Sequence, residues 1–266
     1  SPIIYHTQDL CEKLKNVLGS DYHVEYAMRY KNPSLKKTLE SWEGKKLKQI
    51  IILPLFPHYA SATNGSVIEE AMDVIKKWWV IPELSFVSQF YNEEFYLKGF
   101  EEKGNAHDFK EYDHVLFSFH GLPERHVDKV YKDGLCKDND CGHGINNENI
   151  FCYKATCYET AIQLAKRFKL KEEDYTVGFQ SRLGRGWIEP FSDEIIADLA
   201  KKGAKKLLVF SPAFVADCLE TIIEIGDEYQ ELFEEHGGEK VQLVESLNSS
   251  DTFVHGLKEM ILKRSL

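Results

Sequence analysis

Several short β-rich segments of this chain are apolar at consecutive positions instead of alternating between apolar and polar side chains. The runs 50–56 and 115–119 are the clearest examples. Such runs are typical of strands that are buried on both faces of a parallel sheet, and helical patterns separate them along the chain. Seven segments read as strands: 23–29, 49–54, 84–90, 115–119, 176–180, 206–210 and 241–244. The pattern predicts a doubly wound α/β fold.

The length of the chain and a weak internal sequence similarity predict two similar lobes. The chain has 266 residues, of which 43% are hydrophobic, and a domain usually holds roughly 100 to 200 residues. The strand ends at 52–56 and 209–214 both continue into Pro-x-Phe and then a helix. The polar stretch 103–113 is the expected junction. We therefore expect an N-terminal lobe over 1–108 and a C-terminal lobe over 109–266, whose last helix packs back on the first lobe.

The charge balance argues against a nucleic-acid partner, and the apolar runs argue against a membrane span. The formal net charge is -10 and the pI is near 5.5, whereas a nucleic-acid partner normally requires a concentrated basic patch. The apolar runs fall far short of the ~20 residues that span a bilayer, and the first residues lack the basic and apolar regions of a signal peptide. We expect a cytoplasmic protein that binds no nucleic acid.

An imidazole ends the most apolar strand. In the segment 115–123, written VLFSFHGLP, His120 follows the apolar run, and Gly121 and Pro123 then turn the chain away. Ligands of open α/β sheets bind beyond the carboxyl ends of the strands. His120 is therefore a candidate to accept a proton or ligate a metal. The alternative is a histidine that only closes a backbone hydrogen bond at the strand end.

Carboxylates recur in the segment 216–228, which follows the strand ending at residue 210. Helical spacing places Glu220, Glu224 and Glu228 on one face, while Leu219, Ile222 and Ile223 can face the core. Like charges four residues apart repel slightly, so such a ladder either is solvated or holds cations.

Two further segments suit a pocket for a flat ligand. In 178–193, Trp187 stands near two glycines and could stack on a ligand, or it could equally plug the core. In 53–66, a polar and aromatic loop carries Tyr59 and Ser66 between a strand and a helix.

Taken in order, the motifs LPLFPHYASATNGS, SFHGLP, FQSRLGRGW and SPAFVADCLETIIE closely resemble those of the ferrochelatases, and the resemblance covers nearly the whole chain. That family inserts ferrous iron into a porphyrin at the end of haem synthesis. The resemblance implies two lobes, each with a four-stranded parallel sheet, and a porphyrin in the cleft between them. The porphyrin would be protoporphyrin IX or coproporphyrin III, and the lip of the cleft would make a peripheral membrane contact.

The resemblance also implies roles for individual residues. His120 and Glu220 would face each other across the porphyrin and bind metal or remove the pyrrole protons. Glu224 and Glu228 would form an acidic path for the iron, and Tyr59, Ser66 and Trp187 would line the pocket. The chemistry is consistent with this, because metallating a porphyrin expels two N–H protons and requires basic groups near the ring.

Four of the six cysteines form two C-x4-C pairs, Cys136 with Cys141 and Cys152 with Cys157. In a cytoplasmic chain such clustering indicates metal binding. Structural zinc sites usually have tighter pairs, whereas a four-residue gap occurs in plant-type iron–sulfur proteins, so a [2Fe-2S] cluster is favoured. Some bacterial ferrochelatases resemble this chain in carrying such an insertion. The alternatives are zinc, with His143 as a further ligand, and free thiols.

The first residues depart from the family pattern. Family members begin with a strand that carries an Asn-Leu-Gly-type motif and a glycine-rich stretch, and only then reach the Ser-Pro that is here Ser1-Pro2. We expect either an incomplete chain or a first lobe without its central strand and with an apolar groove in its place. Two other functions stay open: a non-catalytic haem or iron–sulfur sensor, and a cobalt or nickel tetrapyrrole chelatase. The oligomeric state is not predicted.

Overall fold

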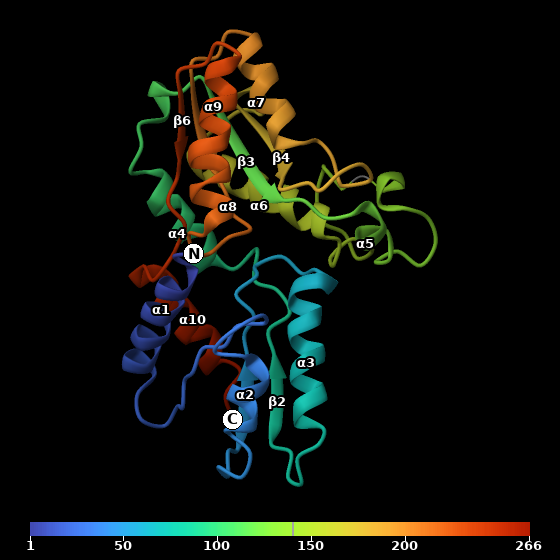
Figure 1. The fold of residues 1–266 in the computed structure, drawn as a ribbon, viewed down its shortest axis with the longest axis vertical. Coiled ribbons are helices and arrows are strands. Elements are labelled where there is room, and N and C mark those ends of the chain that lie inside the picture. Colours follow the sequence, from blue (N-terminus) through green and yellow to red (C-terminus); the bar gives the residue numbers. More distant parts are fainter. Residues whose placement is uncertain (140) are drawn as a thin grey trace.

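The structure is a computed structural model, and it describes residues 1–139 and 141–266. Helices and parallel strands alternate along the chain (Figure 1). The strands are β1 (Gln49–Ile52), β2 (Glu83–Phe86), β3 (His114–His120), β4 (Tyr175–Gln180), β5 (Lys206–Phe210) and β6 (Lys240–Leu243). The α-helices are α1 (Ile3–Leu18), α2 (Leu35–Glu40), α3 (Ser66–Ile75), α4 (Glu94–Gly104), α5 (Glu124–Asp128), α6 (Tyr153–Phe168), α7 (Ser192–Lys201), α8 (Leu219–Ile222), α9 (Tyr229–Glu235) and α10 (Asp251–Leu262).

The second half of the chain forms a four-stranded parallel sheet in the order β4-β3-β5-β6. Its central strand β3 is buried at five consecutive positions, which explains the unbroken apolar run in the sequence. The register pairs His120 with Gln180 at the carboxyl ends of β3 and β4. The predicted α/β class with parallel strands is confirmed.

The first half forms a smaller sheet than predicted. Among the described residues it has two strands, β1 and β2, which run parallel from Gln49 opposite Glu83. The expected four-stranded first sheet is therefore wrong for the part of the chain that the structure describes. The predicted strand 23–29 is also wrong, because this segment lies alongside α1 without a strand partner and a cavity separates it from β1. The other six predicted strands are found, although β1 ends at Ile52 and β2 at Phe86, before their predicted ends at 54 and 90.

Local sequence signals explain where several helices begin and end. Ser34 caps α2, since its hydroxyl accepts a hydrogen bond from the backbone N–H of Lys37 at 3.3 Å. The helix α6 ends at Lys169, whose backbone is left-handed at φ 58°. Two wider π-helical turns occur, at Ser61–Gly65 before α3 and at Glu224–Glu228 between α8 and α9.

One hydrophobic core joins the two halves of the molecule. It extends from Leu10 in α1, through Phe90 and Phe117, to Leu257 in α10. The first sheet has a separate core around Ile50 and Ile75. The helix α10 follows the second sheet in sequence but packs against α1 and α4 (Figure 1). None of the described helices is both long enough and apolar enough to cross a membrane.

Candidate functional site

A large cavity runs along β1 and the segment 21–30 and reaches the carboxyl ends of strands from both sheets. Its volume is about 1470 Å³, which exceeds the roughly 300–1,000 Å³ that is usual for a small-molecule site. The lining includes the loop after β1, the end of β3 and the loop after β5. Among the predicted site residues, His120, Trp187 and Glu220 line it. The topology therefore brings together three side chains that lie up to 100 residues apart in sequence.

His120 is the last residue of β3 and is half-buried. Its Nδ1 lies 2.6 Å from the carbonyl oxygen of Gly121. Because a carbonyl can only accept a hydrogen bond, Nδ1 carries the proton, and Nε2 of the neutral ring keeps its lone pair. The hydroxyl of Tyr153 donates to the His120 carbonyl oxygen at 2.8 Å and fixes the strand end. The ring can therefore act as a base or a metal ligand through Nε2.

Gly121 makes the turn after His120 possible. A Cβ at this position would lie 2.8 Å from the carbonyl oxygen of Gln180 and 3.2 Å from the Trp187 ring. A short bridge between Pro123 and Trp187 holds the half-buried indole beside the turn. The sequence pattern His-Gly before Leu-Pro thus has a steric cause as well as a chemical one.

Glu220 stands in the first turn of α8 and its side chain is exposed to the cavity. Its backbone carbonyl oxygen accepts a hydrogen bond from Nε2 of Gln180 at 2.8 Å. Since Gln180 is the strand partner of His120, one residue connects the backbones that carry the imidazole and the carboxylate.

Gln180 is buried and uses every polar atom of its side chain. Its Oε1 accepts from the hydroxyls of Ser118 at 2.9 Å and Ser211 at 3.3 Å. Its Nε2 donates to Glu220 and, at 3.1 Å, to the carboxylate of Glu224. The side chain therefore ties three strand ends to the segment that follows β5. In the sequence, Gln180 is marked only as part of the motif FQSRLGRGW, which predicts no role for it.

Glu224 holds a structural position. Besides Gln180, its carboxylate accepts hydrogen bonds from the backbone N–H of Ser181 at 2.7 Å, from the Ser181 hydroxyl at 2.5 Å and from the hydroxyl of Tyr229 at 3.3 Å. The proximity of this carboxylate adds to burial in raising the pKa of Tyr229. Glu228 is exposed, and neither Glu224 nor Glu228 lines the cavity. Their role in an iron path stays a prediction.

The predicted helical ladder is wrong in its geometry. The α-helical turn α8 ends at Ile222, and the π-helical turn then changes the spacing between Glu220, Glu224 and Glu228. The apolar side chains expected in the core are exposed, namely Leu219, Ile222 and Ile223, whereas Thr221 and Ile225 are buried. A π-helical turn holds more than the 3.6 residues of an α-helical turn. It therefore rotates the side chains that follow it away from the face that regular α-helical spacing predicts.

Tyr59 and Ser66 are not among the residues that line the cavity. The Tyr59 ring contacts Phe151 edge-on with centroids 5.8 Å apart, and the Ser66 hydroxyl donates to the carbonyl oxygen of Thr63 at 3.1 Å. Their neighbours Ala60 and Thr63 line the cavity instead. Both residues stay predictions as substrate contacts.

Several charged or titratable residues of the lining were given no role from the sequence, among them Arg29 and His126. Arg29 pairs with Glu70 at 3.0 Å, and no motif marks it in the segment that was predicted as a strand. His126 lies in α5, one short turn after His120, and burial lowers its pKa. Its position six residues after His120 was a signal in the sequence.

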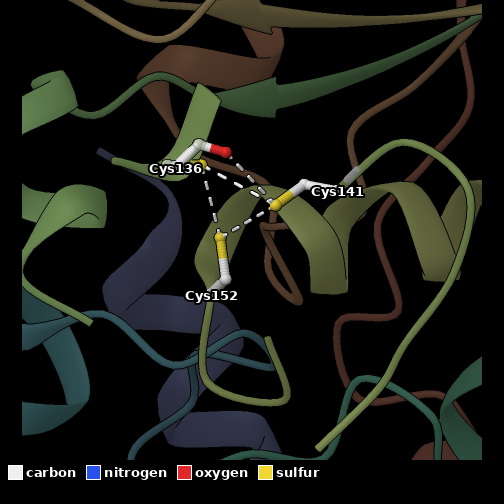
Figure 2. A group of neighbouring side chains, drawn as sticks. All are labelled: Cys136, Cys141 and Cys152. Carbon is white, nitrogen blue, oxygen red and sulfur yellow. Dashed lines mark hydrogen bonds between the residues drawn. The ribbon is translucent and has the colours of Figure 1, made fainter. Parts of the chain in front are cut away.

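Three of the four predicted cluster cysteines meet in a second site (Figure 2). The Sγ atoms of Cys136, Cys141 and Cys152 lie 3.6 to 3.8 Å from one another, and all three residues are buried. The hydroxyl of Tyr131 lies 3.2 Å from the Sγ of Cys141. Hydrogen bonds from the other two thiols lower the pKa of Cys152 and favour its thiolate.

Cys157 does not belong to this group, so its predicted place in the cluster is not supported by the observed geometry. Cys152 directly precedes the first residue of α6, and five residues along an α-helix rotate a side chain by roughly 140°. Cys157 is buried on another face, where burial raises its pKa well above the usual range. His143 is likewise outside the group.

The three sulfur atoms fit a metal–thiolate centre. In a tetrahedral site with metal–sulfur bonds of about 2.3 Å, two thiolates lie roughly 3.8 Å apart. All three observed separations are close to that value, so one tetrahedral ion fits the triad as it stands. A [2Fe-2S] cluster takes four ligands, two on each iron, and would require a fourth ligand and a wider spacing of one thiol.

Comparison with known proteins gives a consistent result. A family model described as Ferrochelatase matches residues 1–265. The chain is 40% identical over 262 residues to a ferrochelatase of Legionella pneumophila (strain Lens), covering 98% of this chain and 78% of the relative. It is 41% identical over 261 residues to a ferrochelatase of Ectopseudomonas mendocina (strain ymp), covering 97% of this chain and 76% of the relative.

Solved structures share the fold at low sequence identity. SirB from Bacillus subtilis with Fe3+ superposes with a TM-score of 0.65 at 13% identity, covering 97% of this chain and 88% of SirB. CbiX, described as the terminal enzyme for biosynthesis of siroheme in denitrifying bacteria, gives a TM-score of 0.58 at 14% identity, covering 100% of this chain and 94% of CbiX. At these identities the likeness concerns the fold alone.

Proposed function

The chain belongs to the ferrochelatase family, lyases that insert iron into a porphyrin, and from that premise we propose that it metallates protoporphyrin IX or coproporphyrin III through His120 and Glu220. The observation that carries the proposal is the arrangement of these two residues. Both line one cavity, and Gln180 links the backbones on which they stand.

The two side chains offer the basic groups that the reaction needs. Metallation releases two pyrrole protons, and the neutral Nε2 of His120 accepts one of them while the exposed carboxylate of Glu220 offers a second oxygen base and an iron ligand. The indole of Trp187 provides a flat surface for the macrocycle. The guanidinium of Arg29 offers a charge partner for the acidic side chains of the porphyrin.

The remaining expectations are part of the same proposal. Glu224 and Glu228 guide iron, Tyr59 and Ser66 contact substrate, the lobes divide at residues 108 and 109, and the protein is cytoplasmic with a peripheral membrane contact. The saturated hydrogen bonding of Glu224 makes Glu228 the freer of the two carboxylates to meet a hydrated cation.

The test is an anaerobic assay in which ferrous iron and porphyrin are mixed with the protein and loss of the free porphyrin spectrum is followed. We expect His120→Ala and Glu220→Gln each to lower kcat by about 10²-fold or more, because positioned acid–base groups contribute on that scale. The exposed His255→Ala on α10 is the matched control and should leave kcat unchanged. Full activity of His120→Ala would contradict the assignment. The ratio of kcat/KM for the two porphyrins identifies the substrate.

We further propose that Cys136, Cys141 and Cys152 hold a metal–thiolate centre that supports the cleft. Cys152 is followed directly by Tyr153, whose hydroxyl bonds the His120 backbone, so the first turn of α6 joins the two sites. The centre is either the [2Fe-2S] cluster that the sequence predicts, with a fourth ligand recruited to it, or a single zinc ion that takes the triad as it stands.

The visible spectrum of anaerobically purified protein separates these groups. A cluster gives broad sulfur-to-iron absorption, whereas zinc gives none and is measured by elemental analysis. Cys136→Ser should abolish either metal, and Cys157→Ser should leave a zinc ion in place but remove a cluster that recruits Cys157. Metal-free protein in which Cys136, Cys141 and Cys152 all react with a thiol reagent would contradict the centre.

A further inference from the structure

The sulfur atoms of the proposed metal centre need hydrogen-bond donors around them. Cys136, Cys141 and Cys152 face one another and are buried (Figure 2), and cysteine binds metal as the thiolate. Three thiolates carry more negative charge than a divalent ion balances. Because buried charge is costly unless hydrogen-bond donors face it, the surrounding chain has to supply such donors.

The backbone N–H groups of the three cysteines do not serve the sulfur atoms. They donate at 2.8 Å to oxygen atoms instead, those of Asp128, Asn139 and Asn149. Cys152 has another donor, because it directly precedes α6 and the backbone N–H of Ala155 in the first turn donates to its sulfur. Cys141 lies in a loop and has no helix start beside it in sequence.

The hydroxyl of Tyr131 serves Cys141. Its oxygen lies 3.2 Å from the Sγ of Cys141. Between a hydroxyl and a free thiol either group can donate, but a metal-bound thiolate has no proton. Once metal is bound, the hydroxyl therefore donates and the sulfur accepts.

The fold holds Tyr131 in this position. The residue follows α5 and is half-buried, and its backbone N–H donates to the carbonyl oxygen of Asp128 at 3.0 Å. The carboxylate of the same Asp128 accepts from the backbone N–H of Cys136. One residue at the end of α5 thus fixes both the tyrosine and the first cysteine of the triad.

We propose that Tyr131 is a further residue of the metal–thiolate centre, in which its hydroxyl donates a hydrogen bond to the metal-bound sulfur of Cys141. The inference rests on the proposed centre, and it applies to a zinc ion and to a [2Fe-2S] cluster alike, because thiolates hold both. Groups that hydrogen-bond a metal ligand change metal affinity by roughly 10- to 100-fold. Tyr131 is a positioning residue: it binds no metal, but it stabilises the charge on a ligand that does.

The first test is the resistance of the purified, metal-loaded protein to EDTA under anaerobic conditions, with elemental analysis of the metal that stays bound. Tyr131→Phe keeps the ring and removes only the hydroxyl. We expect this variant to hold the natural amount of metal and to lose it at an EDTA concentration roughly tenfold lower or less. Tyr158→Phe is the matched control. The Tyr158 ring lies 3.7 Å from where a Cβ of Gly142 would be, next to Cys141 in sequence, and its variant should keep the natural resistance.

Absorption spectroscopy gives a second readout, which a purely structural tyrosine would not change. The sulfur-to-metal charge-transfer band is seen directly for a cluster, and for zinc after exchange with Co2+. Loss of a hydrogen-bond donor raises the energy of the sulfur electrons. The band should therefore move to longer wavelength in Tyr131→Phe and stay in place in Tyr158→Phe.

Two results would overturn the inference, and they differ in what they leave standing. Natural EDTA resistance and an unshifted band in metal-loaded Tyr131→Phe would exclude the hydrogen bond but keep the centre. Metal-free natural protein, in which all three cysteines of the triad react with a thiol reagent, would remove the proposed centre and the role of Tyr131 with it.

Discussion

At the scale of the residue, His58 is a titratable group that the fold keeps neutral. It is fully buried among the rings of Tyr91, Phe119 and Tyr153, and its Nε2 lies 2.9 Å from the hydroxyl oxygen of Thr160. Burial lowers its pKa to about 3. The unfolded chain, with a pKa near 6.5, therefore binds a proton that the folded chain rejects.

This difference predicts that acid destabilises the protein through His58. The stabilisation is complete above the unfolded pKa and is lost as the pH falls from about 6.5 toward 3, by about 1.4 kcal/mol per pH unit. Urea unfolding at pH 7 and pH 5 measures it: the loss of unfolding free energy should be about 2 kcal/mol smaller in His58→Phe than in the natural chain. His255→Phe, at an exposed position, should keep the full loss. An identical pH dependence in both variants would contradict the role of His58.

At the scale of the element, the segment α8 to α9 is organised by Glu224 and not by an apolar face. Its four hydrogen-bond donors come from β4, from the residue after β4, and from α9. A carboxylate accepts from all four at once, whereas an amide of the same shape turns a donor toward them.

We therefore expect Glu224→Gln to lower the unfolding free energy by about 1 to 3 kcal/mol, the usual effect of leaving buried polar groups unsatisfied. Glu228→Gln is the matched control, since Glu228 is exposed and should change stability by less than about 0.5 kcal/mol. Urea unfolding compares the two, and iron-insertion kinetics show whether either carboxylate also affects kcat. A Glu224→Gln chain as stable as Glu228→Gln would contradict the structural role.

The same elements show what could be predicted from sequence. The central strand β3 of the second sheet was recognisable from the sequence, because it is buried on both faces and is therefore apolar along most of its length. The segment 23–29 has the composition of a strand, but strand formation needs a hydrogen-bonding partner, which composition does not reveal. The π-helical turn at Glu224–Glu228 has no compositional mark, so regular spacing misplaced the ladder. The same four-residue gap in both C-x4-C pairs also led to the prediction that Cys157 binds metal as Cys141 does. However, Cys157 lies inside a helix, whereas Cys141 lies in a loop.

At the scale of the whole molecule, the two sheets are held together by α10. Gly256 on this helix lies so close to α4 that a Cβ would overlap the Phe95 side chain. The absence of a side chain thus allows two helices to approach closely, and the shared core continues beside them through Phe253 and Leu257.

This contact reverses the usual effect of alanine in a helix. Gly→Ala normally stabilises a helix by about 1 kcal/mol, but Gly256→Ala should destabilise the protein by about 1 to 3 kcal/mol because the core is overpacked. Gly226→Ala serves as the comparison, since the nearest atom to its Cβ would be 4.0 Å away, and it should cause no loss. Calorimetric unfolding measures both. A higher melting temperature for Gly256→Ala would show that α4 and α10 are less closely packed than described.

The return of α10 also constrains the order of events during synthesis. Residues 251–262 leave the ribosome only after every strand of the second sheet, yet they cover apolar surfaces of α1 and α4 that emerged much earlier. Nascent domains generally fold as units from the amino end. The apolar surfaces of α1 and α4 therefore stay exposed until residues 251–262 have been synthesised. A stalled or prematurely terminated chain keeps these surfaces exposed and is prone to aggregate. We expect holdase chaperones to bind such a fragment first.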